Sequence, residues 1–320
     1  MRPLDVDAIV MANARLSRDY SVLSLAAPEV GRRTAPGQFV MVKPAGVTDP
    51  LLRRPFSVFE VLRNADGAVT GISILNKRAG RSTNKLYELE PGDIVSCLGP
   101  LGVPFKPVAA PAEAWMVAGG VGLAPFATLA ESLAASKTPS TLFYGARTAA
   151  ELFYLEFFEQ LGIKLVLTTE DGGHSASRHC VQGRVTGPLE AALKSASLSD
   201  AAPSGAMVYA CGPEPMLEAV AKLAARYNQP CQVSVERVMG CGLGGCYSCV
   251  VPVKPAFAKA TVGERGDDVA SDLSAEARSA KVEAHRAAEE HANLVRSCIS
   301  GPVFDGAELV WPSTSLRPGD

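Results

Sequence analysis

The sequence lacks the charge pattern and the hydrophobic runs that mark several classes of protein. Its 31 lysine and arginine residues nearly balance 33 aspartate and glutamate residues, and the formal net charge is -2. No basic stripe or basic–aromatic alternation is present, which argues against a nucleic-acid partner. No uninterrupted apolar stretch is long enough to cross a bilayer, so we expect no membrane association. Only four histidines occur, and none accompanies a catalytic cysteine or serine pattern, so no site for an organic substrate is recognisable.

Cysteine is too sparse for a disulfide scaffold. There are eight cysteines in 320 residues, and four of them belong to one motif described below. The other four, which would be stable as free thiols in a reducing compartment, are Cys97, Cys180, Cys211 and Cys231. The first seven residues carry charges where a secretory signal needs an apolar core, so we expect a cytoplasmic location. The length suffices for two or three domains.

Three cysteines lie in one glycine-rich run, Met239-Gly-Cys-Gly-Leu-Gly-Gly-Cys-Tyr-Ser-Cys249, and Cys298 follows near the C-terminus. The spacing Cys241-x4-Cys246-x2-Cys249 with a distant fourth cysteine is typical of a plant-type 2Fe–2S cluster, in which glycines let the loop wrap the irons. A structural zinc ion also takes four thiolates, but zinc sites usually pair them in two short knuckles. The pattern therefore favours an iron–sulfur cluster and an electron carrier.

The first third of the sequence predicts an antiparallel β-barrel. Short alternating or β-branched stretches recur between glycine, proline and aspartate residues, at positions 9–16, 20–25, 38–43 and 71–75. Such strands close most naturally into a barrel.

Two segments of this barrel are candidates for phosphate binding. Arg54-Pro-Phe-Ser57 presents a guanidinium and a hydroxyl, suited to a phosphate and a flavin ring, although an Arg-Pro pair is more often an ordinary solvated turn. Lys77–Thr83 precedes a helix predicted at 84–89, whose N-terminus favours an anion, although an ordinary capped helix explains the same residues. Together the two signals strengthen each other.

Beyond a turn predicted at 98–104, strands alternate with helices. An apolar strand at 114–118 leads into Gly119-Gly-Val-Gly122 and an alanine-rich helix, the first unit of a nucleotide-binding domain, although such glycines also serve ordinary turns. Strands predicted at 141–145, 164–169 and 206–211 end in polar or glycine residues, and ligands bind at that edge of a parallel sheet. Thr148–Glu151 predicts a capping box.

In this order, the motifs resemble the ferredoxin-reductase-like flavoproteins and, within them, the electron-transfer subunits of NAD-dependent dihydroorotate dehydrogenase. The likeness covers nearly the whole chain. Arg54–Ser57 is similar to the family's FAD motif, Gly119–Pro125 to its nicotinamide-side glycine loop, and Cys211–Met216 to its second nicotinamide motif. The run from Cys241 and the segment Arg296–Phe304 are similar to the subunit's cluster domain and its closing ligand.

The resemblance implies a cofactor role for each residue of these motifs. FAD would be held by Arg54 at the pyrophosphate, Phe56 at the flavin or ribityl group, Ser57 near the flavin N5, Pro55 in the same turn, and Gly80, Ser82 and Thr83 at the remaining phosphate oxygens. NAD would be held by Gly119, Gly120 and Gly122, with Cys211 and Gly212 beside the nicotinamide. The 2Fe–2S cluster would be held by Cys241, Cys246, Cys249 and Cys298.

This set of cofactors changes the number of electrons moved at a time. Nicotinamide transfers two electrons as a hydride and a 2Fe–2S cluster accepts one, so a flavin must stand between them. The resemblance implies a partner, a catalytic FMN-containing dihydroorotate dehydrogenase subunit of pyrimidine biosynthesis in a hetero-oligomer. Two alternatives remain open: a subunit linked to ferredoxin, sulfur or hydrogenase partners, and a non-enzymatic iron–sulfur redox sensor, against which the complete FAD and nicotinamide motifs argue.

We predict three domains: an FAD-binding β-barrel at 1–108, an α/β NAD-binding domain at 109–230, and a 2Fe–2S domain at 231–320. The last contains an insertion at about 258–293 that favours helix but has almost no large apolar residue to bury, so we expect an exposed excursion rather than a docking element. The resemblance favours NADH over NADPH. Arg147 could meet a 2′-phosphate, but Glu170 and Asp171 at a neighbouring strand end would repel it.

Overall fold

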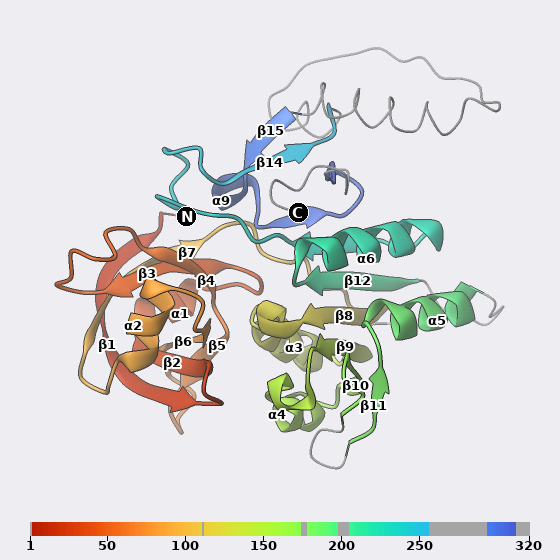
Figure 1. The fold of residues 1–320 in the computed structure, drawn as a ribbon, viewed down its shortest axis with the longest axis horizontal. Helices are drawn as coiled ribbons and strands as arrows, with labels where there is room; N and C mark the ends of the chain where they lie inside the picture. Colours follow the sequence, from red (N-terminus) through yellow and green to blue (C-terminus); the bar gives the residue numbers. More distant parts are fainter. Residues whose placement is uncertain (1, 111, 174–177, 198–204, 256–292, 312–320) are drawn as a thin grey trace.

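Two seven-stranded sheets stand side by side, and a small C-terminal layer lies against the boundary between them (Figure 1). The computed structural model describes residues 2–110, 112–173, 178–197, 205–255 and 293–311. The insertion predicted at 258–293 lies outside these residues except for its last position. Within the described residues, no helix is long and apolar enough to cross a membrane.

The first sheet is antiparallel throughout and curls back on itself. Its elements are β1 (Leu4–Arg15), β2 (Tyr20–Ala26), α1 (Pro28–Arg33), β3 (Phe39–Pro44), β4 (Arg54–Ser57), β5 (Glu60–Arg63), β6 (Val69–Lys77), α2 (Arg81–Glu88) and β7 (Ile94–Leu101). The strand order is β4-β3-β7-β1-β2-β6-β5. Strands β4 and β5 lie at opposite edges but are consecutive in the chain: the Val58 N–H donates to Gln38 beside β3, and the Phe59 N–H donates to Ser73 of β6. The predicted barrel is confirmed as a half-barrel.

The turn predicted at 98–104 is wrong for its first four residues, which belong to strand β7. The strand continues to Leu101, and its pairing with β3 shifts register between Phe39 and Met41. Pro100 has no partner in the pairing with β1 or in that with β3, so its missing N–H costs no ladder hydrogen bond. Pro100 is therefore accommodated in a central strand by the register shift of β3 opposite it. The local sequence around Pro100 does not indicate this shift.

The second sheet is parallel except for its last strand. Its elements are β8 (Glu113–Gly119), a 3-10 turn (Gly120–Leu123), α3 (Phe126–Ala135), β9 (Ser140–Ala146), a second 3-10 turn (Ala149–Glu151), α4 (Leu155–Gln160), β10 (Lys164–Thr169), β11 (Cys180–Gln182), α5 (Thr186–Ser197), β12 (Ala206–Cys211), α6 (Glu214–Arg226), β13 (Cys231–Ser234) and β16 (Val303–Asp305). The strand order is β11-β10-β9-β8-β12-β13-β16. From β8 the chain adds strands toward one edge of the sheet, and from β12 it adds them toward the other edge, so the order of strands reverses between β8 and β12. The predicted parallel α/β domain is confirmed.

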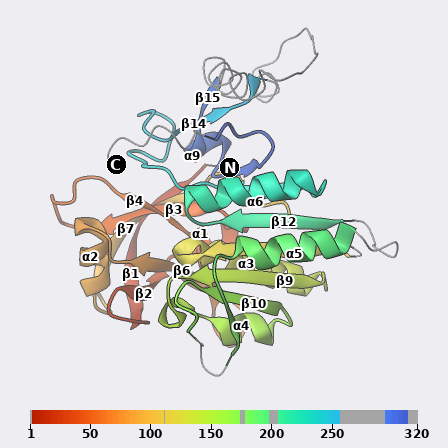
Figure 2. The ribbon, with the colours of Figure 1, turned by 45° about the vertical axis from the view of Figure 1, so that its right-hand side comes forward.

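Strand β8 shows why the sequence there is continuously apolar. Met116 and Ala118 pack with α3 and α4, whereas Trp115 and Val117 pack with α5 and α6. Figure 2 shows α5 and α6 running along one side of the sheet. Because helices cover both faces, every inner position of the strand is buried.

The C-terminal layer contains β14 (Val250–Val253) paired with β15 (Asn293–Arg296), followed by α9 (Ser297–Ser300). Strands β13 and β16 fall within the predicted third domain, yet they are hydrogen-bonded into the nucleotide-binding sheet. The reason is that β13 pairs in parallel with β12, and β16 then pairs with the other edge of β13. The three domain boundaries stay predictions.

The linker between the two sheets is fastened by Phe105. This side chain is 2% exposed, stacks on Phe126 with ring centroids 5.8 Å apart, and meets Tyr209 edge-on at 5.5 Å. The Phe105 N–H donates to Pro36 of the half-barrel, and the Val108 N–H donates to the Tyr209 hydroxyl. The linker is therefore anchored on both sides.

We expect Phe105→Ala to lower the free energy of unfolding by about 3–5 kcal/mol, because it leaves a cavity where the two sheets meet. Urea denaturation followed by Trp fluorescence and by far-UV circular dichroism should show the loss. The conservative variant Phe105→Leu should lose clearly less. An unchanged midpoint for Phe105→Ala would contradict the anchoring role.

Candidate functional site

Strand pairing brings the distant fourth cysteine to the cysteine loop. Val250 of β14 pairs with Arg296 of β15, so Cys249, one residue before Val250, lies beside the segment that carries Cys298. The Ser297 N–H donates to the Cys249 carbonyl at 2.9 Å, which extends this pairing by one bond. All four predicted ligands thus meet in one region.

The four thiols form two pairs. Cys241 acts to lower the pKa of Cys246 and Cys249 acts to raise the pKa of Cys298, so the members of each pair lie near each other. In the described part of the chain, no three histidine, cysteine, aspartate or glutamate side chains converge as ligands of a single ion. A 2Fe–2S cluster needs two cysteines on each of two irons, whereas zinc needs four ligands around one centre. Two pairs of thiols fit the two irons of a binuclear cluster.

The two pairs differ in burial. Cys249 and Cys298 are 2% and 1% exposed and pack with Met41 and Leu101 of the half-barrel. Burial, followed by contact with Cys249, raises the pKa of Cys298 to about 12. Cys246 is exposed, and hydrogen bonds led by that to the neighbouring serine lower its pKa to about 6. The inner pair is therefore buried against the half-barrel, whereas the outer pair has one exposed thiol, Cys246, and one half-buried thiol, Cys241.

Glycines let the loop wrap around Cys241. Gly242 and Gly244 have φ angles of 73° and 79°, and a Cβ on Gly242 would lie 2.7 Å from Met41 Cγ. The N–H groups of Leu243 and Gly245 both donate to Cys241 Sγ at 3.3 Å. Such N–H···S bonds stabilise a thiolate and tune the potential of an attached cluster.

Two supporting residues of this loop were missed by the sequence analysis. Ser248 Oγ accepts a hydrogen bond from the Gly240 N–H at 2.9 Å and lies 3.1 Å from Cys246 Sγ. Arg296 Nη1 donates to the Gly244 carbonyl at 2.6 Å. Both residues adjoin the predicted ligand motifs, but their type alone carries no signal of this role.

Arg54 is an uncompensated charge at the edge of the half-barrel. Its Nη1 donates to the carbonyl oxygens of Leu52 and Arg53, and among the described residues it takes part in no ion pair. The adjacent Arg53 instead donates to Asp5 at 2.5 Å and to Ser96 at 2.7 Å. Arg54 is therefore the guanidinium of this pair that is available to an anion.

The other predicted FAD residues lie on β4 and at the start of α2. Phe56 and Ser57 are half-buried and pair with β3. Helix α2 begins at Arg81, three residues earlier than predicted. Ser82 is 6% exposed, and the Thr83 hydroxyl accepts hydrogen bonds from the backbone of this turn, so its hydroxyl shapes the helix start.

The loop before β4 is tied to α2. Arg81 donates to the Asp49 carboxylate at 3.2 Å, and Lys85 donates to the Asp49 carbonyl at 2.5 Å. A Cβ on Gly80 would meet open space. The chain thus joins the Arg54 loop to a helix N-terminus, the two groups that favour a pyrophosphate. These residues fit the FAD for which the sequence predicts them.

The predicted NAD residues meet at the switch point of the second sheet. A Cβ on Gly122 would lie 2.2 Å from the Cys211 carbonyl oxygen, and one on Gly119 would lie 2.7 Å from Met216 Sδ. Gly120 has a φ of 55°. Burial raises the pKa of Cys211 to about 12, so its thiol is neutral at physiological pH. The ends of β8 and β12 form the crevice in which such sheets bind nucleotides.

The capping box predicted at Thr148–Glu151 is wrong. The Thr148 side chain makes no capping bond, and the Glu151 N–H donates to the Thr148 carbonyl instead. The segment is a short 3-10 turn, so its N–H is already occupied. The Glu151 carboxylate bonds to Arg147 at 3.0 Å and to the Tyr20 hydroxyl at 3.4 Å.

Comparison with known proteins gives matches over most of the chain. Residues 116–222 match an oxidoreductase NAD-binding domain, and residues 236–260 match the iron–sulfur cluster binding domain of dihydroorotate dehydrogenase B. The dihydroorotate dehydrogenase B (NAD(+)) electron transfer subunit of Geobacillus kaustophilus is 38% identical over 252 residues, 77% of this chain and 89% of the relative. That of Desulforamulus reducens is 30% identical over 307 residues, 95% and 98% of the two chains. The structure of the NADH-dependent reduced ferredoxin-NADP oxidoreductase superposes with a TM-score of 0.70 at 21% identity, covering 95% and 90%.

The half-barrel, the parallel sheet and the C-terminal iron–sulfur region define a ferredoxin-reductase-like oxidoreductase. Within that class, the chain belongs to the family of dihydroorotate dehydrogenase B (NAD(+)) electron transfer subunits. The predicted family, oxidoreductase class, NAD and iron–sulfur cofactors are confirmed, and FAD accords with the fold. The individual site residues stay predictions.

We expect Cys298→Ser to lose the iron–sulfur absorption while FAD stays bound, because one iron then lacks a thiolate. Iron, sulfide and flavin analysis of the purified protein checks this outcome. Cys180→Ser, at a 3% exposed cysteine outside the motif, should keep full iron. Stoichiometric iron and sulfide in Cys298→Ser would show that another group closes the site.

Arg54→Ala should reduce the affinity for FAD at least about tenfold, since one charge-assisted bond to a phosphate contributes about 1.5–3 kcal/mol. Flavin content after dialysis measures the effect. Arg53→Ala is the matched control and should retain FAD, because Arg53 is engaged with Asp5. Equal flavin content in the two variants would refute the assignment of Arg54.

Proposed function

We propose that the chain passes electrons between NAD and a catalytic subunit that oxidises dihydroorotate, using FAD and a 2Fe–2S cluster. The relatives bear the name of that electron transfer subunit. The observation that carries the proposal is the difference in burial within the cysteine site: Cys249 and Cys298 pack against the FAD half-barrel, whereas Cys246 is exposed at the surface.

Strand β3 connects the flavin motif to the cluster. Met41 pairs in register with Pro55 of the Arg54–Ser57 motif, and the same side chain lies against Gly242 of the cysteine loop. A flavin held by β4 would therefore lie close to the inner cysteines. The short separation suits transfer of single electrons without a further carrier.

The opposite side of the half-barrel meets the nicotinamide crevice. Leu75 of β6 and Leu123, at the end of the glycine turn, belong to one buried cluster, and Phe59 meets Tyr154 edge-on at 4.6 Å. The half-barrel thus contacts the glycine turn on one side and the cysteine loop on the other. When bound there, FAD supplies the step between two-electron and one-electron transfer.

Exposed apolar side chains around the outer cysteines support a protein partner. The loop and α9 present Val238, Leu243, Tyr247 and Ile299 with exposures of 81%, 54%, 62% and 49%. The Arg296 guanidinium lies 4.8 Å from the Tyr247 ring centroid and adds a charged edge. Large apolar side chains gathered on one surface mark protein interfaces. We assign this surface to the catalytic, FMN-containing subunit of a hetero-oligomer.

The free thiols accord with a cytoplasmic location for this complex. Outside the cluster motif, Cys97, Cys180 and Cys231 are buried and unpaired as disulfides, as expected in a reducing compartment. A ferredoxin- or sulfur-linked acceptor would use the same cofactors, so the partner is the variable to test.

NADH should bleach the flavin of the purified chain and support reduction of one-electron dyes, yet the chain alone should not oxidise dihydroorotate. Addition of the catalytic subunit should couple dihydroorotate oxidation to NADH formation, followed at 340 nm by the usual nicotinamide absorbance. Oxidation of dihydroorotate by the chain alone would refute the proposal, as would failure of any such subunit to bind.

A substitution at Val238 tests the apolar surface that we assign to the catalytic subunit. Val238→Glu should weaken coupling to the catalytic subunit while dye reduction by NADH persists. Val181→Glu, at a 43% exposed position on β11, is the matched control and should leave coupling intact. Equal rates of coupled dihydroorotate oxidation in the two variants would refute the assignment of this surface to the catalytic subunit.

A further inference from the structure

Arg147 lies just beyond β9, at the edge of the parallel sheet where nucleotides bind. Gly119 of β8 pairs with Gly145 of β9, so Arg147 follows two residues beyond the partner of the glycine turn. In nucleotide-binding sheets, an acidic residue in this region bonds the ribose 2′-hydroxyl of NAD, whereas an arginine accommodates the 2′-phosphate of NADP. Judged by residue type alone, this position would favour NADP.

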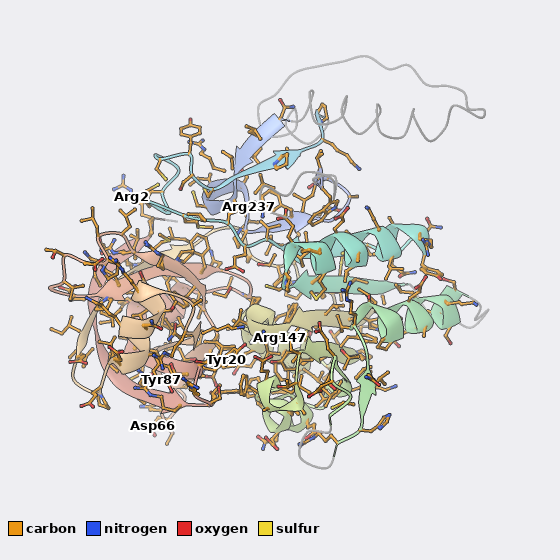
Figure 3. The ribbon with its side chains drawn as sticks, in the orientation of Figure 1. Arg2, Tyr20, Asp66, Tyr87, Arg147 and Arg237 are labelled. Carbon is orange, nitrogen blue, oxygen red and sulfur yellow. The ribbon has the colours of Figure 1, made fainter. Side chains whose placement is uncertain are left out.

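The Arg147 guanidinium is already engaged. Its Nη2 lies 3.0 Å from Glu151 Oε1, and the side chains of Arg147 and Glu151 are 69% and 19% exposed. The same carboxylate oxygen accepts the Tyr20 hydroxyl of the half-barrel at 3.4 Å, while the Tyr144 hydroxyl donates to the Glu151 carbonyl at 3.0 Å. Figure 3 shows Tyr20 and Arg147 at the boundary between the two sheets. Glu151 is thus held from both sheets.

The carboxylate of Glu151 is ionised at neutral pH. Burial acts to raise its pKa, but the hydrogen bond and charge of Arg147 and the charge of Lys77 lower the pKa below its usual value. Lys77 itself lies over the Tyr20 ring, 5.1 Å from the centroid. Both members of the pair therefore carry their charges at neutral pH, and the structure holds them 3.0 Å apart.

The backbone of two further acidic residues lies beside Arg147. Glu170 and Asp171 follow β10, and their N–H groups donate to the carbonyl oxygens of Ala146 and Arg147, both at 3.3 Å. These bonds fix the acidic backbone segment beside the end of β9. A 2′-phosphate would meet acidic residues on two sides and a guanidinium that is already paired.

We propose that Glu151 determines nucleotide specificity: by holding Arg147 in an ion pair anchored to Tyr20, it denies that guanidinium to a 2′-phosphate, so the chain accepts NADH and rejects NADPH. The inference rests on the proposed binding of NAD at this sheet edge. Glu170 and Asp171 reinforce the rejection by repulsion. The 2′-hydroxyl of NAD carries no charge and needs no free guanidinium.

The first test compares binding of ADP-ribose and 2′-phospho-ADP-ribose by calorimetry, which requires no electron transfer. Glu151→Gln keeps the side-chain shape but removes the charge, so affinity for 2′-phospho-ADP-ribose should rise severalfold, the scale expected for an exposed ion pair. Affinity for ADP-ribose should change little. The ratio of kcat/KM for NADPH and NADH with a one-electron dye should shift in the same direction.

A double variant and a control identify the cause. Glu151→Gln combined with Arg147→Ala should lose the gain, because the released guanidinium is then missing. Glu218→Gln is the control. Glu218 and Lys222 form a similar ion pair on α6, with a distance of 2.6 Å and side-chain exposures of 16% for Glu218 and 64% for Lys222. The control variant should leave the ligand ratio unchanged.

The outcomes separate this inference from the proposed function. An unchanged ratio in Glu151→Gln, or a gain that survives removal of Arg147, would overturn the role of Glu151. Arg147→Ala alone, at an exposed position, should barely alter the already weak binding of 2′-phospho-ADP-ribose; a severalfold loss would show that Arg147 is not withheld. Failure of the unaltered chain to bind ADP-ribose or to react with NADH would instead refute NAD binding at this edge, and both proposals with it.

Discussion

The packing of the cysteine loop against β3 and β7 is the contact on which the rest of the arrangement depends. An electron carrier must hold its redox groups close together, and here Met41 touches Gly242 of the loop while its strand pairs with the flavin motif. The close approach is possible because Gly242 has no side chain. Burial of Cys249 and Cys298 at the same contact gives the site an inner and an outer side. We therefore expect packing, rather than any catalytic side chain, to set the path of the electrons.

A second glycine contact, between Gly122 and the Cys211 backbone, shapes the predicted nicotinamide site. Gly122 lies against the backbone of Cys211 at the point where the sheet reverses its strand order. The crevice opens there because the helices that follow the neighbouring strands β8 and β12, namely α3 and α6, lie on opposite faces. The half-barrel contributes Leu75 to the core beneath this turn. One half-barrel therefore serves as the common wall of both redox contacts, which explains why the linker at Phe105 is so thoroughly anchored.

Features with a local cause could be predicted from the sequence. The cysteine spacing, the glycine turn after β8 and the apolar strands of the second sheet each reflect neighbouring residues, and the structure contains all of them. Features with a distant cause could not. Pro100 is tolerated in β7 because β3 changes register opposite it, and Glu151 bonds to Tyr20, 131 residues away, rather than capping its own turn. The exposure difference between the two cysteine pairs is likewise set by the half-barrel, to which the motif itself gives no clue.

The strand that follows the fourth cysteine has a consequence for solubility. β16 pairs antiparallel with β13 and covers what would otherwise be the open edge of the nucleotide-binding sheet, a row of unpaired backbone groups of the kind that recruits other chains into aggregates. Only a few residues separate Cys298 from this strand, and the Gly301 N–H donates to Ser297 within that short connection. The segment that carries the predicted ligand Cys298 thus leads directly into the strand that pairs with this sheet edge. We therefore expect a change in this stretch of chain to affect both the cysteine site and the edge of the nucleotide-binding sheet.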